Sequence, residues 1–152
     1  MTLQNVTVII PAHNRPERLR RLLNYYRHTD IKILVPDSSD RIFPYAAEYP
    51  KVTYLHRPRL HFLLKIKEIL PFINTPYVVY CADDDFIVPT GIAQMVAFLE
   101  THPDYNTAQG HYLTFTPRKG KVHFYPRYIR YFDKRITDET PRERLLQLEF
   151  NL

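Results

Sequence analysis

Short apolar segments recur along the first hundred residues of the chain. Residues 6–10 contain almost no polar side chain, which is typical of a strand at the centre of a parallel sheet covered on both faces. A second apolar segment spans residues 31–35 and ends at Pro36. Residues 52–55 and 77–81 are rich in β-branched and aromatic side chains. They predict a short third strand and a fourth strand that is buried on both faces.

Between these segments the apolar residues follow a helical period. From Pro16 to about His28 they fall at spacings of three and four, which predicts an amphipathic helix that begins at the proline. A second helix is predicted over residues 60–70, and a third begins after Pro89 with Thr90 as its N-cap residue. A helix between two consecutive strands gives a parallel pair, so the pattern predicts an α/β fold. The residues expected on the buried faces of the first and third helices are Leu19, Leu22, Leu23, Tyr26, Ile92, Met95, Val96 and Leu99.

The last third of the chain has a different pattern. Residues 107–116 and 121–125 predict two β segments joined by a hairpin-like connection that contains Gly120. Thr140 and Glu143 have the spacing of a capping box and indicate the start of a last helix. Because this helical pattern still continues where the sequence stops, we expect the chain to be a fragment of a longer domain.

The composition is that of one ordinary globular domain, with 152 residues of which 45% are hydrophobic and 24% charged. The sequence contains no apolar run long enough to span a membrane, and its first residues lack the basic start and apolar stretch of a signal peptide. Its one cysteine, Cys81, lies inside a predicted strand, so no disulfide can form within the chain. These features favour a reducing, cytoplasmic setting.

The chain is basic, with a formal net charge of +5 and a sequence pI of about 9.3. This balance suits an acidic ligand, such as a nucleotide, a nucleic acid or an anionic membrane surface. Basic and aromatic residues are interleaved between residues 118 and 135, an arrangement that can stack on bases and hold phosphates. A solvated basic face would give the same pattern. The low glycine content, 3 residues against 13 prolines, excludes a glycine-rich phosphate loop.

Three consecutive carboxylates, those of Asp83, Asp84 and Asp85, follow the fourth predicted strand. Like charges this close raise one another's pKa unless a cation lies nearby. Mg²⁺ or Mn²⁺ binds one or two carboxylates and completes its shell with water and substrate phosphates. In open α/β sheets, ligands bind beyond the carboxyl ends of the strands, where Asp37 and the loop around Asn14 are also expected. Favourable charge before the third helix would explain the same acidic run, so the residues alone leave both interpretations open.

Three motifs occur in a fixed order along residues 6–89. The first strand is followed by Pro-Ala-His-Asn-Arg at residues 11–15, the second by an aspartate and small polar residues at 37–40, and the fourth by the acidic cluster. Together they resemble the nucleotide-binding and Asp-X-Asp motifs of family-two glycosyltransferases with the GT-A fold. The resemblance implies a Rossmann-like α/β/α sandwich with a mostly parallel central sheet. Residues 1–152 would form a single domain of this kind, with its nucleotide-binding half at 1–100 and the start of its acceptor-side region at 101–152.

The resemblance also implies roles for individual residues. Asp37 would accept a hydrogen bond from the base, typically from a uracil N–H, and Asp83 would lie near the ribose. Two departures from the motifs are Ala82, which stands where the family usually has its first aspartate, and His13, which stands where an aromatic residue is frequent. The expected nucleotide-binding residues are Pro11, Ala12, Asn14, Arg15, Asp37 and Asp83, and the expected metal ligands are Asp84 and Asp85.

The reaction implied is metal-dependent transfer of a sugar, such as a hexosyl group, from a nucleotide-diphosphate donor to an acceptor hydroxyl. A UDP-sugar is the expected donor, and the acceptor would be a saccharide, a lipid or a protein. Mn²⁺ or Mg²⁺ would neutralise charge on the leaving diphosphate. In this family the general base comes from the second half of the domain, so we expect it beyond the end of the chain. We assign none of Asp133, Asp138 and Glu139 to this role, and the chain alone need not be active.

Three other functions remain open on the sequence. A degenerate, non-catalytic nucleotide-binding domain is supported by Ala82. A nucleic-acid-binding module would use residues 118–135, and we regard nucleic acid as the less favoured partner. A nucleotidyltransferase would carry a glycine-rich loop and a lysine after the first strand, and residues 12–15 lack both. A cytoplasmic location is expected, with peripheral association at the inner membrane surface as an alternative.

Overall fold

The computed structural model of the chain describes residues 3–127, 137–140 and 142–144. The chain divides into two compact units, Met1–Ala108 and Gln109–Leu152, and each is described by itself. The expectation that both belong to one domain stays a prediction. Within the described residues, none of the helices has the length and apolar content that a membrane crossing requires.

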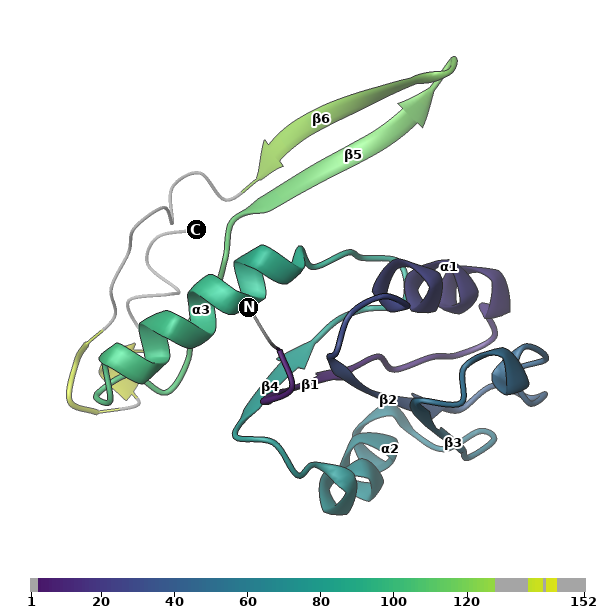
Figure 1. Cartoon of the computed structure of the whole chain (residues 1–152), viewed down its shortest axis with the longest axis horizontal. Helices are drawn as coiled ribbons and strands as arrows, with labels where there is room; N and C mark the ends of the chain where they lie inside the picture. The colour runs from purple at the N-terminus through teal and green to yellow at the C-terminus, as the bar shows by residue number, and fades with distance from the viewer. Residues whose placement is uncertain (1–2, 128–136, 141, 145–152) are drawn as a thin grey trace. The chain divides into compact units, whose positions relative to one another are not determined.

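The first unit is built on a parallel sheet with the strand order β3-β2-β1-β4 (Figure 1). The chain runs from β1 through β2 to β3 on one side and then crosses to β4 on the other side of β1. The order therefore reverses beside β1, and such a switch point is where open α/β sheets bind their ligands. The strands are β1 (Val6–Ile9), β2 (Lys32–Asp37), β3 (Val52–His56) and β4 (Tyr77–Tyr80).

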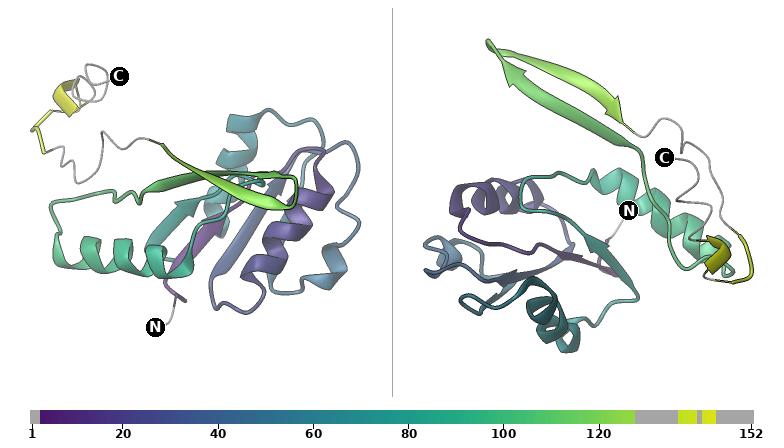
Figure 2. Two further views of the ribbon diagram at one scale, coloured as in Figure 1. Left: turned by 90° about the horizontal axis from the view of Figure 1, so that it is seen from above. Right: turned by 180° about the vertical axis from the view of Figure 1, so that it is seen from behind.

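Helices cover both faces of this sheet, which confirms the predicted α/β/α arrangement. Helices α1 (Pro16–Tyr26) and α3 (Pro89–Thr101) lie on one face, and α2 (Phe62–Ile69) lies on the other (Figures 1 and 2). The four residues predicted for the buried face of α1 are buried. Helix α3 begins two residues earlier than predicted, with Pro89 as its first residue and Val88 as the N-cap residue. Proline suits that position because it has no N–H to satisfy, so the assignment of Thr90 as N-cap is wrong.

The second face of the sheet is only partly covered. Helix α2 and the 3-10 turn η2 (Leu70–Phe72) follow the short turn η1 (Ala46–Glu48) and strand β3 along the chain, and they enclose a small core of Ile9, Leu34 and Ile69. The prediction that the fourth strand is buried on both faces is wrong, because Val78 and Tyr80 are each 47% exposed. β4 is an edge strand of the described sheet, so it has a neighbouring strand on one side only.

Strand β2 extends further than its sequence predicts. The expected stop at Pro36 does not occur, and the strand continues to Asp37. Pro36 cannot donate a hydrogen bond, but its carbonyl oxygen accepts one from the Ala12 N–H at 3.0 Å. The Asp37 carbonyl oxygen accepts one from the Arg57 N–H at 2.7 Å. The strand therefore keeps its pairing on both sides without a donor from the proline.

The second unit contains an antiparallel hairpin, as predicted. Its strands are β5 (Tyr112–Arg118) and β6 (Lys121–Arg127). Lys119 and Gly120 between them have φ angles of 51° and 72°, which are typical of the two-residue turns that match the twist of a hairpin. The predicted capping box is confirmed, since Glu143 N–H donates to the Thr140 hydroxyl at 3.2 Å and the Thr140 N–H donates to the Glu143 carboxylate at 3.1 Å. Residues 142–144 are helical, and the part of the predicted last helix beyond them lies outside the described residues.

Candidate functional site

The loops that follow β1 and β2 are joined at the carboxyl edge of the sheet. Ala12 and Asp37 form a parallel bridge beyond the end of β1, and the Ser38 N–H donates to the Ala12 carbonyl oxygen at 3.1 Å. The prediction that Asp37 lies beside the loop around Asn14 is therefore confirmed. Pro11 is half-buried at the start of the same loop.

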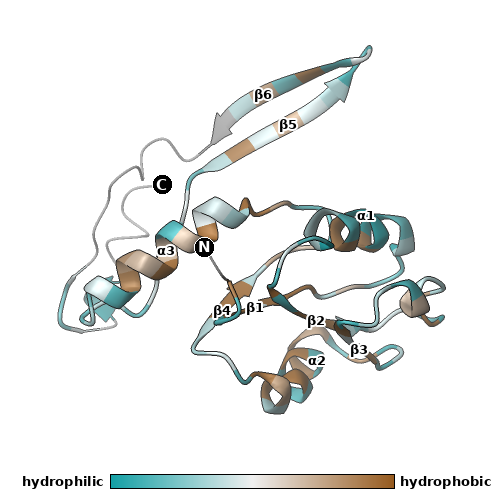
Figure 3. Ribbon diagram, viewed as in Figure 1, coloured by the Kyte–Doolittle hydropathy of each residue, from teal (hydrophilic) through white to brown (hydrophobic). Residues whose placement is uncertain are grey.

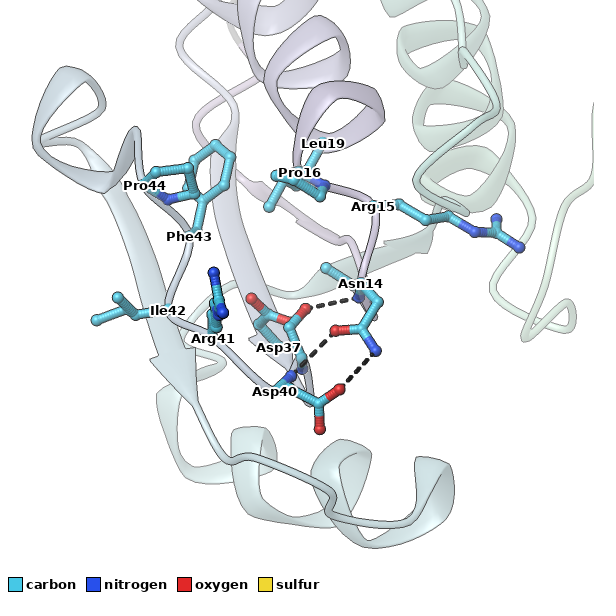
Figure 4. Close-up of a pocket in the computed structure, with 12 residues that line it drawn as sticks. Asn14, Arg15, Pro16, Leu19, Asp37, Asp40, Arg41, Ile42, Phe43 and Pro44 are labelled. Atoms are coloured by element: carbon cyan, nitrogen blue, oxygen red, sulfur yellow. Dashed lines mark hydrogen bonds between the residues drawn. The ribbon is translucent and has the colours of Figure 1, made fainter.

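Asn14 links the two loops through its side chain (Figure 4). Its amide nitrogen Nδ2 donates to Asp40 Oδ2 at 3.1 Å, and its Oδ1 accepts from the Asp40 N–H at 3.0 Å. The Asn14 N–H donates to the Ser39 hydroxyl at 2.7 Å. Asn14 has a φ of 52°, a left-handed conformation that asparagine tolerates better than most residues. The bond from Asn14, together with one from Arg59, lowers the pKa of the Asp40 carboxyl.

Asp37 is 2% exposed, and its carboxylate is held by two neighbours. Its Oδ1 accepts from the Ser39 N–H at 2.8 Å and from the Ser39 hydroxyl at 2.5 Å, while its Oδ2 accepts from the Tyr54 hydroxyl at 2.6 Å. Burial and the bond to Asp37 raise the pKa of Tyr54. A carboxylate offers about four acceptor positions, so one remains for a further donor.

A cavity of about 460 Å³ lies between these loops and the start of α1 (Figure 4). Four of the predicted nucleotide-binding residues line it, while Pro11 and Asp83 do not. A volume of roughly 300–1,000 Å³ is typical of small-molecule sites, so the cavity can hold a ligand the size of a nucleoside. The lining residues are Ala12, Asn14, Arg15, Pro16, Leu19, Asp37, Ser39, Asp40, Arg41, Ile42, Phe43 and Pro44.

Two arginines pair with the acidic cluster after β4, and one of them, Arg15, also lines the cavity. Arg15 Nη1 lies 3.1 Å from Asp83 Oδ1 and 3.3 Å from Asp84 Oδ2, and Arg18 Nη1 lies 2.5 Å from the same Asp84 oxygen. Burial raises the pKa of Asp83, and the charge of Arg15 opposes this rise. Asp84 is partly exposed and Asp85 is exposed. Arg15, which lines the cavity, thus pairs with Asp83 and Asp84, which do not line it.

A comparison of the sequence with known families gives a match over most of the chain. The family model described as glycosyl transferase family 2 matches residues 7–148. The chain belongs to glycosyltransferase family 2. This membership confirms the predicted family, and the parallel sheet flanked by helices agrees with its GT-A fold. No curated protein matches the sequence.

The acidic residues of this family 2 glycosyltransferase domain suit a metal ion only if a phosphate ligand completes its coordination. No group of three or more His, Cys, Asp or Glu within the described part of the chain is arranged to hold a metal ion. Mg²⁺ and Mn²⁺ do not need such a cage, because they bind one or two carboxylates together with phosphate oxygens. The oxygen donors of Asp84 and its neighbours suit that mode. Arg15 and Arg18 neutralise Asp84 already, so a cation would have to compete with them.

Several residues that shape the candidate site were not among the binding residues and metal ligands expected from the sequence. Arg18, Ser39 and Tyr54 hold the carboxylates of Asp84 and Asp37. Lys65 reaches the Ala12 carbonyl oxygen from α2. A signal for Lys65 existed, because it stands four residues before Ile69 and therefore on the buried face of α2. His13, which stands where the family frequently has an aromatic residue, has its Nδ1 3.1 Å from both the Ser38 carbonyl and hydroxyl oxygens.

Proposed function

We propose that the first unit binds the nucleotide diphosphate of a sugar donor, most simply a UDP-sugar, for metal-dependent transfer to an acceptor hydroxyl. The observation that supports this most directly is the position of Arg15. It lines the cavity and also pairs with Asp83 and Asp84. A nucleoside in the cavity would therefore have its phosphates beside the acidic cluster, where a bridging cation can bind.

The base and ribose would be held by the two joined loops. One acceptor position of the Asp37 carboxylate is open to a base N–H such as that of uracil. Pro11 and Ala12 would contact the nucleoside through the backbone, and Asn14 would hold the loop in its left-handed conformation. Asp83, which is buried beside Arg15, would lie on the ribose side of the cluster.

The diphosphate would lie between the positively charged arginines and the carboxylates that hold the cation. Arg15 and Arg18 present guanidinium groups, which bind phosphate oxygens well. Asp84, with Asp85 as a second ligand, would hold Mn²⁺ or Mg²⁺. When bound, that cation supplies Lewis-acid neutralisation of the leaving diphosphate. The transferred sugar would be a hexosyl group, and the acceptor a saccharide, a lipid or a protein.

Transfer with inversion also needs a general base on the acceptor side. We propose that this base lies outside the first unit and assign it to no residue. Asp138 and Glu139 precede the capping box, and their carbonyl oxygens accept hydrogen bonds from Arg144. Asp133 lies outside the described residues. This chain would therefore contribute the donor-binding half of the reaction, in the cytoplasm or at the inner membrane surface.

Calorimetric titration of UDP into the protein tests the donor site. We expect binding with Mn²⁺ present, loss of binding in EDTA, and loss in Asp84→Ala. Glu100→Ala is the matched control, because Glu100 is an exposed carboxylate of α3 away from the cluster, and it should bind as the unmodified chain does. The proposal would be overturned if the unmodified chain bound none of UDP, GDP and TDP, either with Mn²⁺ or with EDTA.

A degenerate, non-catalytic nucleotide-binding domain is the second candidate. Two observations favour it: Ala82 replaces the first aspartate of the motif, and Arg15 and Arg18 already neutralise Asp84. This candidate predicts that UDP binds equally well with Mn²⁺ and with EDTA. The nucleic-acid alternative falls on residues 118–135, of which those after 127 lie outside the described residues. It would be recognised by binding that weakens steeply with salt and needs no divalent ion.

A further inference from the structure

Lys65 is buried inside the first unit although its side chain is charged. Only 4% of the residue is exposed, and it is the one buried lysine or arginine among the described residues. Its Nζ donates to the Ala12 carbonyl oxygen at 2.7 Å and to the Ser38 hydroxyl at 3.1 Å. These two acceptors belong to different loops, one after β1 and the other after β2. Lys65 therefore ties together the two loops that form the cavity.

The orientation of α2 makes this burial notable. Helix α2 carries mostly hydrophobic residues (Figure 3), yet Leu63 and Leu64 are 67% and 50% exposed while Lys65 on the same helix is only 4% exposed. Burying an ammonium group costs free energy unless it is well hydrogen-bonded or compensated by charge. Burial lowers the pKa of Lys65, and the carboxylates of Asp37 and Asp83 oppose this. The burial of apolar surface does not explain why this helix exposes its leucines and buries a lysine. The hydrogen bonds that the lysine makes do explain it.

The bonds of Lys65 reach residues that line or adjoin the cavity. Ala12 lines the cavity, and its carbonyl oxygen accepts from both the Ser38 N–H and Lys65 Nζ. Ser38 lies between Asp37 and Ser39, which are both lining residues. Lys65 itself does not line the cavity. Lys65 therefore affects the site indirectly, through the two loops that it joins.

We propose that Lys65 is a positioning residue that holds the loops after β1 and β2 at the separation that nucleotide binding requires. The inference rests on the proposed function, since the nucleotide is the ligand for which the loops are held. The lysine supplies two charge-assisted hydrogen bonds, which are stronger than neutral ones. It also places positive charge behind two carboxylates of the site, Asp37 and Asp83.

The test compares Lys65→Met and Lys65→Arg with Lys67→Met as the matched control, since Lys67 is exposed on the same helix. UDP affinity is measured by calorimetry with Mn²⁺, and hydrogen exchange of the Ser38 amide reports the junction of the loops. Methionine keeps the length and removes the bonds, so affinity should fall about tenfold or more and exchange at Ser38 should quicken. Lys65→Arg should recover part of both effects, and Lys67→Met should stay within about twofold of the unmodified chain.

Each outcome decides a different question. Affinity of Lys65→Met within about twofold of the unmodified chain, with unchanged exchange at Ser38, would overturn the inference. If Lys65→Met fails to fold, Ser38→Ala removes one of the two acceptors and should still weaken UDP binding several-fold, and its failure to do so would overturn the inference as well. Absence of UDP binding by the unmodified chain would overturn the donor site itself. In that case the exchange rates still decide whether Lys65 holds the loops.

Discussion

Arg15 Nη1 lies 3.1 Å from Asp83 Oδ1, although 68 residues separate the two in the sequence. The Asp83 side chain is 7% exposed and that of Arg15 is 51% exposed, so a guanidinium that reaches in from solvent balances a largely buried carboxylate. Arg15 belongs to the loop after β1 and Asp83 to the loop after β4. The pair therefore joins the loops that follow β1 and β4, at the point where the strand order of the sheet reverses.

A double-mutant cycle should show that this ion pair contributes to stability. With Arg15→Met and Asp83→Asn, we expect a coupling free energy of about 1 kcal/mol, because loss of the guanidinium leaves a buried charge unpaired while solvent still screens Arg15. The measurement is urea unfolding of the four proteins of the cycle. Arg59 and Asp40 form a matched exposed pair, with side chains 85% and 57% exposed, and their coupling should be close to zero. Equal coupling in the two cycles would contradict the prediction.

The left-handed conformation of Asn14 leads to a second prediction. Asn14→Ala and Asn14→Gly both lose the hydrogen bonds to Asp40, but only glycine adopts a positive φ without strain. Asn14→Ala should therefore unfold with a free energy about 1 kcal/mol lower than that of Asn14→Gly. Urea unfolding of both variants measures this difference. It would be inconsistent with the structure if the alanine variant were as stable as the glycine variant.

Much of the fold follows from local patterns in the sequence. The apolar residues of β1 and the three- and four-residue spacings in α1 predict those elements and their buried faces, because both signals depend on near neighbours in the chain. The wrong predictions about β2 and β4 share a cause. Each concerns a strand whose burial or length depends on the neighbouring elements and not on its own sequence. The exposure of Val78 depends on the edge position of β4. The continuation of β2 beyond Pro36 depends on a hydrogen bond from Ala12.

The candidate site divides in the same way. The grouping of Asn14 with Asp37 could be predicted, because parallel strands place their carboxyl ends at one edge of the sheet. The contacts of Asp37 with Tyr54 and of Ala12 with Lys65 could not, since each depends on how β3 and α2 lie against β2. The engagement of Asp84 by two arginines likewise depends on how the start of α1 and the loop before it lie against the loop after β4. Motif spacing identifies which residues meet, but not which partners they already hold.

Burial of Cys81 leads to a prediction about pH. Burial raises the pKa of this thiol to about 11 from an ordinary value near 9, so the folded state favours the protonated form. The corresponding stability is fully present below pH 9 and is lost as the pH rises towards 11. Unfolding free energies should fall by about 2 kcal/mol more over this interval in the unmodified chain than in Cys81→Ala. Parallel pH dependences of the two proteins in urea unfolding would refute this account.

The orientation of α2 gives a last prediction, from a pair of substitutions on one helix. Ile69 is fully buried against Ile9 and Leu34, whereas Leu63 is 67% exposed. Ile69→Ala removes buried contacts and leaves a cavity, so it should lower the unfolding free energy by about 2–4 kcal/mol. Leu63→Ala removes a side chain of the same size from solvent, and its cost should stay below about 0.5 kcal/mol.

The comparison is sharp because both residues are aliphatic, lie on the same helix and are changed to the same residue. Thermal or urea unfolding measures both variants under one condition. A cost for Leu63→Ala as large as that for Ile69→Ala would mean that Leu63 is covered in solution. The assignment of the leucines to the exposed face of α2 would then be wrong. The assignment of Lys65 to its buried face depends on it.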